Sequence, residues 1–407
     1  MELEYVLGSK ETLEIMKKKA AFVPFHEKII DFLDEMSKRL LKSSKAKQYQ
    51  DVIAFAFWCR KASLIEMKKN IAWLPSAREK GVLGRGIVFH VAPSNVAMNF
   101  AYSFVAGLLA GNANIVRLPS KKFPQVDCFC NVLKEMLQEL EEWKSYLCFV
   151  RYGHEKEITD MLSEISDVRV IWGGDVTIQE IRKSPLKIRG KEIVFSDRYS
   201  IGVIDAKYFL LLSKEQKKRI AQGFYNDTYL MDQNACTSPM LLVWIGIQNI
   251  VKKAQKDFWD IVLDFVQKKY ELQPVQAVKK LQALYRLAAA VPGTTLSSFE
   301  DIPGKVDNRI VRVRLPKLSF DSMNYKENSG FFMEYITEKL EDILPICTSR
   351  CQTISFLGEH LENDLRELVK KYCPSGVDRI VPMGKTLNFS LIWDGYDLIR
   401  EMSRELG

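Results

Sequence analysis

The sequence lacks the cysteine and histidine spacings that build metal sites. Its 407 residues include eight cysteines and four histidines, and none of the cysteines forms a CxxC pair. Because zinc-binding sites usually hold their ligands at such short spacings, we predict no metal site. The cysteines are then expected to remain free thiols, which fits a protein of the reducing cytoplasm.

Long apolar runs are missing as well. No stretch reaches the roughly 18 apolar residues that a membrane-spanning helix requires. Residues 1–19 lack the apolar core of a signal peptide. These absences predict a cytoplasmic protein without a membrane span.

Charge of one sign is not concentrated in any segment. Lysine and arginine number 59 against 51 aspartates and glutamates, which gives a net charge of +8 spread along the chain. This distribution is typical of a mildly basic, solvated surface, so we expect no nucleic-acid partner. A content of 47% hydrophobic residues excludes a disordered chain. The length predicts roughly two to three domains.

Short apolar segments alternate with helical segments after residue 84. Before them, residues 26–70 contain neither glycine nor proline and space their apolar residues as packed helices do. The alternation is typical of an α/β fold with a parallel, doubly wound sheet. The predicted strands cover residues 86–91, 114–118, 147–151 and 168–172, and the helices cover residues 95–110, 123–140 and 155–165.

The α/β pattern continues in the second half of the chain. Ser213 and Gln216 resemble a capping box that opens a helix through about residue 230. We place the change of domain near residue 210. Further strands are predicted at residues 192–195, 201–204 and 239–247, and amphipathic helices at residues 248–270 and 274–290.

The first strand is not followed by a dinucleotide-binding GxGxxG motif, because glycines 81, 84 and 86 lie before the strand or at its start. The first and fourth strands end instead in residues 92–95 (APSN) and 172–175 (WGGD). Open α/β sheets bind ligands at the carboxyl ends of their strands, and glycine lets a ligand approach the backbone closely. A simple strand-to-helix turn explains Gly173 and Gly174 equally well.

The end of the second strand carries basic residues. Residues 117–122 (RLPSKK) contain no aspartate or glutamate, which would hold an adenosine ribose diol. Basic residues suit a 2′-phosphate, so this segment favours NADPH over NADH if a nucleotide binds. The alternative is a solvated, basic start of a helix.

Cys236 is the candidate nucleophile. It lies in a polar, tightly turned segment between a predicted helix and a buried strand, whereas most of the other seven cysteines have apolar neighbours. A thiol is suited to chemistry in which a thioester must form. No histidine lies nearby in the sequence to act as its base. From the residues alone, a catalytic and a structural role for Cys236 stay equally open.

Six segments, in order, resemble one enzyme family. The first, FHVAPSNVAMNFAYSFVAGLLAGNANIVRLPSK, is similar to an aldehyde dehydrogenase superfamily segment, and together the six resemble the bacterial fatty acyl-CoA reductases of the LuxC family. The chain looks shorter than typical members, mostly at its N terminus. The segments are residues 89–121, 170–175 (VIWGGD), 232–239 (DQNACTSP), 330–335 (GFFMEY), 351–358 (CQTISFLG) and 376–399 (GVDRIVPMGKTLNFSLIWDGYDLI).

The resemblance implies an aldehyde dehydrogenase-like fold. Residues 1–210 would form N-terminal helices and a Rossmann-type NAD(P)-binding domain, and residues 211–375 an α/β catalytic domain. Residues 376–407 would return to the cofactor domain. The resemblance also suggests acyltransferase and acyl-protein synthetase partner subunits and a homo-oligomer.

The resemblance assigns roles to named residues. Cys236 would take the acyl group as a thioester, and the Asn95 amide would form an oxyanion hole with the backbone N–H of Cys236. Glu334 would hold the nicotinamide ribose, although a surface helix carboxylate is nearly as good an explanation. The cofactor groove would be lined by Ala92, Pro93, Ser94, Arg117, Ser120, Lys121, Gly173 and Gly174.

One departure from the superfamily bears on the reaction. Residues 196–202 (SDRYSIG) correspond to an ELGG motif whose glutamate activates the deacylating water, and they contain no glutamate; Asp197 is not assigned that role. We therefore predict NADPH-dependent reduction of a fatty acyl group, from acyl-CoA or an acyl-protein, to the aldehyde, with coenzyme A as acyl carrier. The alternatives are an NAD(P)-dependent aldehyde dehydrogenase and a non-redox subunit that holds or transfers the acyl group.

Overall fold

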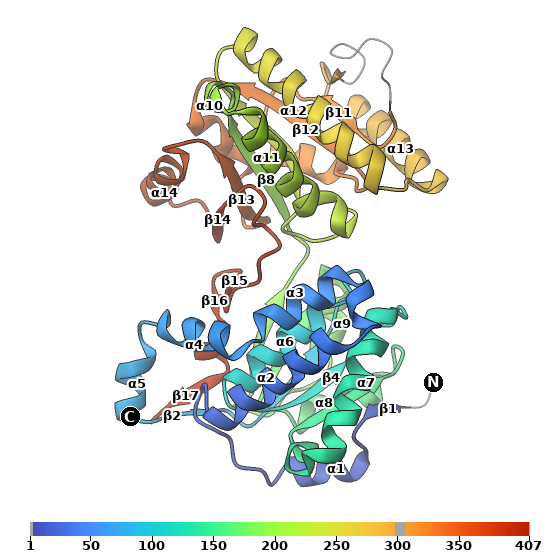
Figure 1. The fold of residues 1–407 in the computed structure, drawn as a ribbon, viewed down its shortest axis with the longest axis vertical. Coiled ribbons are helices and arrows are strands. Elements are labelled where there is room, and N and C mark those ends of the chain that lie inside the picture. Colours follow the sequence, from blue (N-terminus) through green and yellow to red (C-terminus); the bar gives the residue numbers. More distant parts are fainter. Residues whose placement is uncertain (1–2, 298–306, 407) are drawn as a thin grey trace. The chain divides into compact units, whose positions relative to one another are not determined.

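The computed structural model describes residues 3–297 and 307–406, which form two compact units (Figure 1). The first unit comprises Met1–Ser196 and Phe389–Gly407, and the second comprises Asp197–Asn388. None of the helices in the described ranges is both long and apolar enough to cross a membrane.

The first unit opens with a strand and a set of helices. The segment 26–70, predicted to be helical, forms α2, α3 and α4, joined by short turns. The first strand and helix, β1 and α1, precede it. The bounds are β1 (Glu4–Leu7), α1 (Lys10–Met16), α2 (Glu27–Lys42), α3 (Gln50–Trp58), α4 (Lys61–Lys69) and α5 (Leu74–Lys80).

Within its described residues, the first unit contains a six-stranded sheet in the order β1-β5-β4-β3-β6-β7. β1 pairs antiparallel with β5, and the remaining neighbours are parallel, as the alternating pattern predicts. The strands are β3 (Ile87–Val91), β4 (Ala113–Arg117), β5 (Leu147–Arg151), β6 (Val168–Trp172) and β7 (Lys191–Phe195). The intervening helices are α6 (Asn99–Leu109), α7 (Pro124–Glu139), α8 (Lys156–Glu164) and α9 (Asp175–Arg182).

The strand order places the point of reversal at β3. From β3 the chain moves outward to β4 and β5 and then returns to the other side of β3 as β6. In doubly wound sheets, ligands bind at the carboxyl ends of the strands beside such a reversal. The turns after β3 and β6 are therefore where the fold favours a cofactor.

Helix α6 begins later than the sequence predicts. It starts at Asn99 rather than residue 95, so Ser94 and Asn95 lie in an exposed loop after β3. Serine and asparagine favour such loops because their side chains compete for backbone hydrogen bonds.

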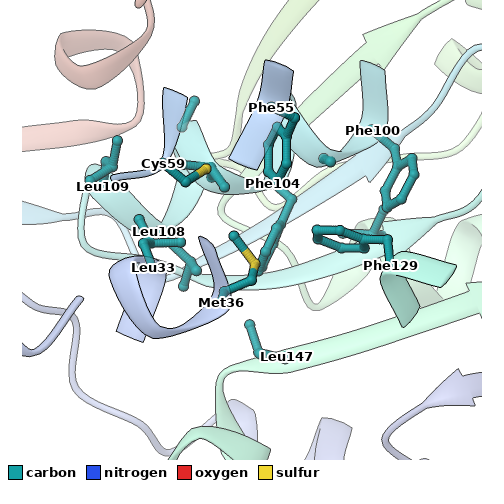
Figure 2. Close-up of a cluster of buried hydrophobic side chains, with 14 of the residues drawn as sticks. Leu33, Met36, Phe55, Cys59, Phe100, Phe104, Leu108, Leu109, Phe129 and Leu147 are labelled. Carbon is teal, nitrogen blue, oxygen red and sulfur yellow. The ribbon is translucent and has the colours of Figure 1, made fainter. Parts of the chain in front are cut away.

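The buried face of α6 packs against α2, α3 and α7 (Figure 2). Phe55, Phe104 and Phe129 meet there with Leu33 and Met36, and each of the five is fully buried. The rings of Phe104 and Phe149 are edge to face, with centroids 5.2 Å apart. This cluster fixes α6 on the sheet.

The described part of the second unit contains a seven-stranded sheet in the order β10-β11-β12-β9-β8-β13-β14. The capping box at Ser213 and Gln216 is confirmed at the start of α11. The strands are β8 (Tyr199–Asp205), β9 (Pro239–Ile245), β10 (Thr295–Leu296), β11 (Val311–Arg314), β12 (Phe331–Thr337), β13 (Cys351–Leu357) and β14 (Arg379–Pro382). The helices are α10 (Ala206–Leu211), α11 (Lys214–Thr228), α12 (Gln248–Lys269), α13 (Pro274–Ala290) and α14 (Leu361–Tyr372).

The crossings between units differ from the predicted domain limits. The chain leaves the first unit after Ser196 rather than near residue 210, because β8 pairs with β9 and β13 of the second sheet. It returns at Phe389 rather than residue 376, because β14 still pairs with β13. Within the first unit the returning segment forms β17 (Ser403–Glu405), which pairs with β2 (Val82–Gly84).

Candidate active site

The first group of predicted site residues lies at the carboxyl ends of β3 and β4. The Ala92 N–H donates to the Arg117 carbonyl over 3.1 Å, which extends the pairing of the two strands. Beyond Pro93, the hydroxyls of Ser94 and Ser120 are 2.8 Å apart, and both residues are exposed. The structure therefore brings together two predicted cofactor residues that are 26 positions apart.

The two predicted cations of this edge behave differently. The guanidinium of Arg117 donates to the carbonyl of Gly153 and lies 4.3 Å from the ring centroid of Tyr152. It is thus held at the end of β5. The ammonium of Lys121 contacts the Phe123 ring at 5.1 Å, and its residue is exposed. Lys121 is the cation with more freedom to reach a ligand.

Gly174, the N-cap of α9, has no structural need to be glycine. Its backbone is extended (φ −70°, ψ 163°), a conformation open to any residue. A Cβ atom built there would meet no described atom within 4 Å outside the adjoining residues. By contrast, a Cβ at Gly173 would lie 3.2 Å from the Thr177 side chain. Gly174 adjoins the first backbone N–H groups of α9, which have no partner within the helix and favour anions.

The candidate nucleophile, Cys236, lies in the second unit in the turn before β9. It is half-buried, whereas Cys59, Cys128, Cys130, Cys148, Cys347 and Cys351 are buried and Cys373 is exposed. Six of the seven other thiols are therefore inaccessible, as their apolar neighbours predict. Cys373 ends α14 in a left-handed conformation.

Hydrogen bonds from three directions hold the Cys236 turn. The Ser200 hydroxyl of β8 donates to the Cys236 carbonyl over 2.7 Å. The buried Gln233 side chain accepts from the backbone N–H of Gly330 over 2.6 Å, which ties the turn to the start of β12. The Asn234 side chain accepts from Asn328 over 2.9 Å. These polar residues flank the cysteine in the sequence, but only the fold identifies their partners.

Sequence reasoning also missed Asp227, which lies inside a predicted helix and carries no motif. Its carboxylate is buried and accepts the backbone N–H groups of Gly384 and Thr386 over 2.6 and 3.0 Å. Its carbonyl accepts the hydroxyl of Ser238 over 2.7 Å. Burial raises the pKa of this carboxyl to about 6. Asp227 thus connects the end of the Cys236 turn with residues 384–386.

In the segment predicted to correspond to the ELGG motif, the carboxylate of Asp197 takes part in ion pairs. Asp197 forms ion pairs with Lys326 and Arg350, each at 3.1 Å. Each of its two oxygens faces one of these cations, and the exclusion of Asp197 as a general base stays a prediction.

The position of Glu334 differs from the one predicted for a cofactor residue. It is neither on a surface helix nor available to a ribose, because it lies fully buried within β12. One of its oxygens accepts the indole N–H groups of Trp244 and Trp259, both at 2.9 Å, and Gln255 at 3.2 Å. The other oxygen pairs with Arg312 at 2.9 Å. These four partners make it part of the core of the second unit.

Asn95 and Cys236 belong to different units. Asn95 lies in the loop after β3 in the first unit, where its residue is exposed, and Cys236 lies in the second. Their pairing as an oxyanion hole stays a prediction.

A family model described as "Acyl-CoA reductase (LuxC)" matches residues 23–253. The match covers the strands of the first sheet from β3 to β7 and continues through Cys236 into α12. No curated protein matches the sequence.

Solved structures of aldehyde dehydrogenases match nearly the whole chain. The Δ1-pyrroline-5-carboxylate dehydrogenase from Mycobacterium tuberculosis is 12% identical, with a TM-score of 0.61 over 97% of this chain and 82% of its own. The Thermus 1-pyrroline-5-carboxylate dehydrogenase with bound NAD is also 12% identical, with a TM-score of 0.62 over 98% and 83%. Lactaldehyde dehydrogenase from Escherichia coli is 12% identical, with a TM-score of 0.57 over 97% and 85%. The aldehyde dehydrogenase-like fold is thereby confirmed.

The buried position of Glu334 predicts a change in stability rather than in cofactor binding. Glu334→Gln leaves the Arg312 charge without its counter-ion in the core, so we expect the free energy of unfolding to fall by about 3–5 kcal/mol. Urea denaturation measures this, with Glu338→Gln, an exposed residue near the end of β12, as control. If the unfolding midpoint were unchanged and nucleotide binding were weaker, the result would contradict this account and support the predicted contact of Glu334 with the ribose.

Proposed function

This chain belongs to the LuxC family of acyl-CoA reductases, and we propose that it reduces an activated fatty acyl group to the aldehyde with NADPH, through a thioester on Cys236. The acyl donor is acyl-CoA or an acyl-protein. The observation that carries the proposal is Cys236 itself. It is a half-buried thiol in a turn held by Ser200, Gln233 and Asn234, among cysteines that are mostly buried.

The residues at the carboxyl ends of β3, β4 and β6 suit a nicotinamide dinucleotide. Open space at Gly174 and the N-terminus of α9 fit its phosphates. The joined hydroxyls of Ser94 and Ser120 provide neutral donors beside them, and Lys121 provides a cation for a 2′-phosphate. When bound, the cofactor supplies the hydride that reduces the thioester. The absence of an acidic residue in 117–122 favours NADPH, although the Thermus relative was solved with NAD.

In the first half-reaction, the thiolate of Cys236 attacks the carbonyl carbon of the acyl donor. The bond to the carrier sulfur breaks, coenzyme A or the carrier thiol leaves with a proton, and the acyl group stays on Cys236 as a thioester. The oxyanion that forms would accept from the Asn95 amide and the Cys236 backbone N–H. Each such donor is worth about 3 kcal/mol to the transition state.

The sequence of residues 196–202 disfavours hydrolysis of the thioester. Residues 196–202, predicted to correspond to the ELGG motif, contain no glutamate to activate water, and both oxygens of Asp197 are engaged by Lys326 and Arg350. The thioester would therefore persist until it is reduced or exchanged with another thiol. On reduction, the aldehyde departs and the Cys236 thiolate is released for the next cycle. This argument favours a reductase over an aldehyde dehydrogenase that forms free acid.

Cys236→Ala should abolish reduction of acyl-CoA. We expect NADPH consumption with the best member of a short- to long-chain acyl-CoA series to fall about 1000-fold or more, because no other group can carry the acyl intermediate. Absorbance of NADPH measures the rate, and Cys373→Ala, which removes the exposed thiol, is the matched control. Full activity of the Cys236→Ala protein would refute the mechanism. Acylation of Cys236 without any NADPH consumption would favour a subunit that only holds the acyl group.

Gly174→Ala should weaken cofactor binding without unfolding the protein. The added methyl has room in the unliganded fold, so we expect the unfolding free energy to change by less than about 0.5 kcal/mol. A methyl pressed against a phosphate costs roughly 1–3 kcal/mol, so the Kd for NADPH should rise about tenfold. Calorimetric titration measures the Kd. The control is Val176→Ala, which shortens an exposed side chain in the first turn of the same helix. Unaltered affinity in Gly174→Ala would place the phosphates elsewhere.

A further inference from the structure

Four buried polar side chains lie directly behind the Gly173-Gly174 turn. His90 of β3 bonds through Nδ1 to the Ser103 hydroxyl at 2.7 Å and through Nε2 to Asn114 Oδ1 at 2.8 Å. The Ser103 hydroxyl also accepts the indole N–H of Trp172 at 3.0 Å. Trp172 is the last residue of β6 and immediately precedes Gly173. One chain of hydrogen bonds thus joins β4, β3, α6 and the end of β6.

The hydrogen bonds allow a single assignment of donors. The Asn114 amide nitrogen donates to the Asn112 carbonyl, so its oxygen faces His90 and the His90 Nε2 must carry the proton. Nδ1 then accepts from the Ser103 hydroxyl, whose oxygen is left to accept from Trp172. Burial lowers the pKa of His90 to about 4, which keeps the ring neutral and this order of donors intact.

The packing around the four side chains is close. A Cβ atom on Gly107 of α6 would lie 2.0 Å from Asn114 Oδ1 and 2.9 Å from His90 Nε2, so only glycine lets the helix approach this far. On its other side, the Trp172 ring stacks on Phe195 with centroids 3.7 Å apart. The Gly173 N–H donates to the Phe195 carbonyl over 3.1 Å. The indole is therefore held both by its edge and by its face.

If these four side chains only stabilised the fold, apolar side chains could take their place. Replacing both partners of a buried hydrogen bond by apolar groups can leave the stability nearly unchanged. What the hydrogen bond adds is orientation. It fixes the rotation of the indole, whereas apolar packing tolerates several arrangements. The residue whose orientation is fixed adjoins the turn at which the cofactor's phosphates are proposed to bind.

We propose that Ser103 and His90 are positioning residues for the cofactor turn. By holding Trp172, they keep Gly173, Gly174 and the first N–H groups of α9 aimed at the phosphates of a nicotinamide dinucleotide. The inference rests on the proposed function for the identity of the ligand. The effect of the hydrogen-bond chain on the turn can be measured without any ligand, so its test is separate from that of the proposed function.

The test compares Ser103→Ala and Trp172→Phe with a matched control. The control is Ser37→Ala, which also removes a buried hydroxyl that joins two elements. Ser37 lies on α2 and donates to the Ala56 carbonyl of α3 over 2.6 Å, so it is outside the hydrogen-bond chain. Calorimetric titration gives the Kd for NADPH, amide hydrogen exchange of the peptide covering residues 172–182 reports the turn without ligand, and urea denaturation gives the stability of each variant.

We expect Ser103→Ala and Trp172→Phe each to raise the Kd about fivefold, the effect of one hydrogen bond. The double variant should bind no more weakly than either single variant, because Ser103 acts through Trp172. Both should speed exchange in residues 172–182. Ser37→Ala should lose comparable stability while its Kd and exchange match the wild type.

Wild-type affinity in Ser103→Ala, or additive losses in the double variant, would overturn the proposal. If the wild-type protein binds neither NADPH nor NADH, the proposed function fails. The exchange measurement still decides whether the hydrogen-bond chain orders the turn. Unchanged exchange in both variants would then overturn the positioning role.

Discussion

Parallel pairing of β3 with both β4 and β6 is the constraint on which the cofactor edge depends. Parallel strands need crossover helices, so the loops after β3, β4 and β6 all emerge at one edge of the sheet. Residues distant in the sequence meet there, as the hydroxyls of Ser94 and Ser120 do at 2.8 Å. The Gly173-Gly174 turn joins the same edge because β6 returns beside β3. The Phe-rich cluster under α6 fixes the helix that carries Ser103 behind this turn (Figure 2).

In the second unit, the fold holds the Cys236 thiol half-buried in the turn before the buried strand β9. This turn is held by the Ser200 hydroxyl of β8, the Asn328 side chain and the Gly330 backbone N–H. Asp227 extends the connections to residues 384–386. A nucleophile needs such rigidity because a misplacement of about 1 Å can cost 100-fold in rate. The buried ion pair of Glu334 and Arg312, by contrast, lies in the interior of the second unit.

Local patterns in the sequence predicted the regular elements well. The strands β5 and β6 have the predicted bounds, the capping box at Ser213 opens α11, and α12 and α13 follow the predicted amphipathic helices. These features depend on spacing within one segment, which a sequence displays directly. The break between β3 and α6 was misplaced because the apolar run of residues 96–110 hides the loop that precedes Asn99.

Contacts between distant segments could not be predicted in the same way. Glu334 looked like an available carboxylate because its partners Trp244, Trp259 and Arg312 come from other elements. The hydrogen bonds that link Asn114, His90, Ser103 and Trp172 join four separate elements, so no pattern within one segment predicts them. The observed boundary after Ser196 differs from the predicted one near residue 210 for a related reason. The pairing of β8 with β9 and β13 cannot be predicted from the sequence of β8 alone.

The central claim is that Cys236 carries the acyl group. Incubating the protein with a long-chain acyl-CoA in the absence of NADPH, followed by peptide mass spectrometry, tests it most directly. The account predicts one acyl mass on the peptide that contains Cys236, and its loss, with release of aldehyde, when NADPH is added. An acyl group on a different residue, or turnover to aldehyde by a protein that never acquires acyl mass at Cys236, would contradict it.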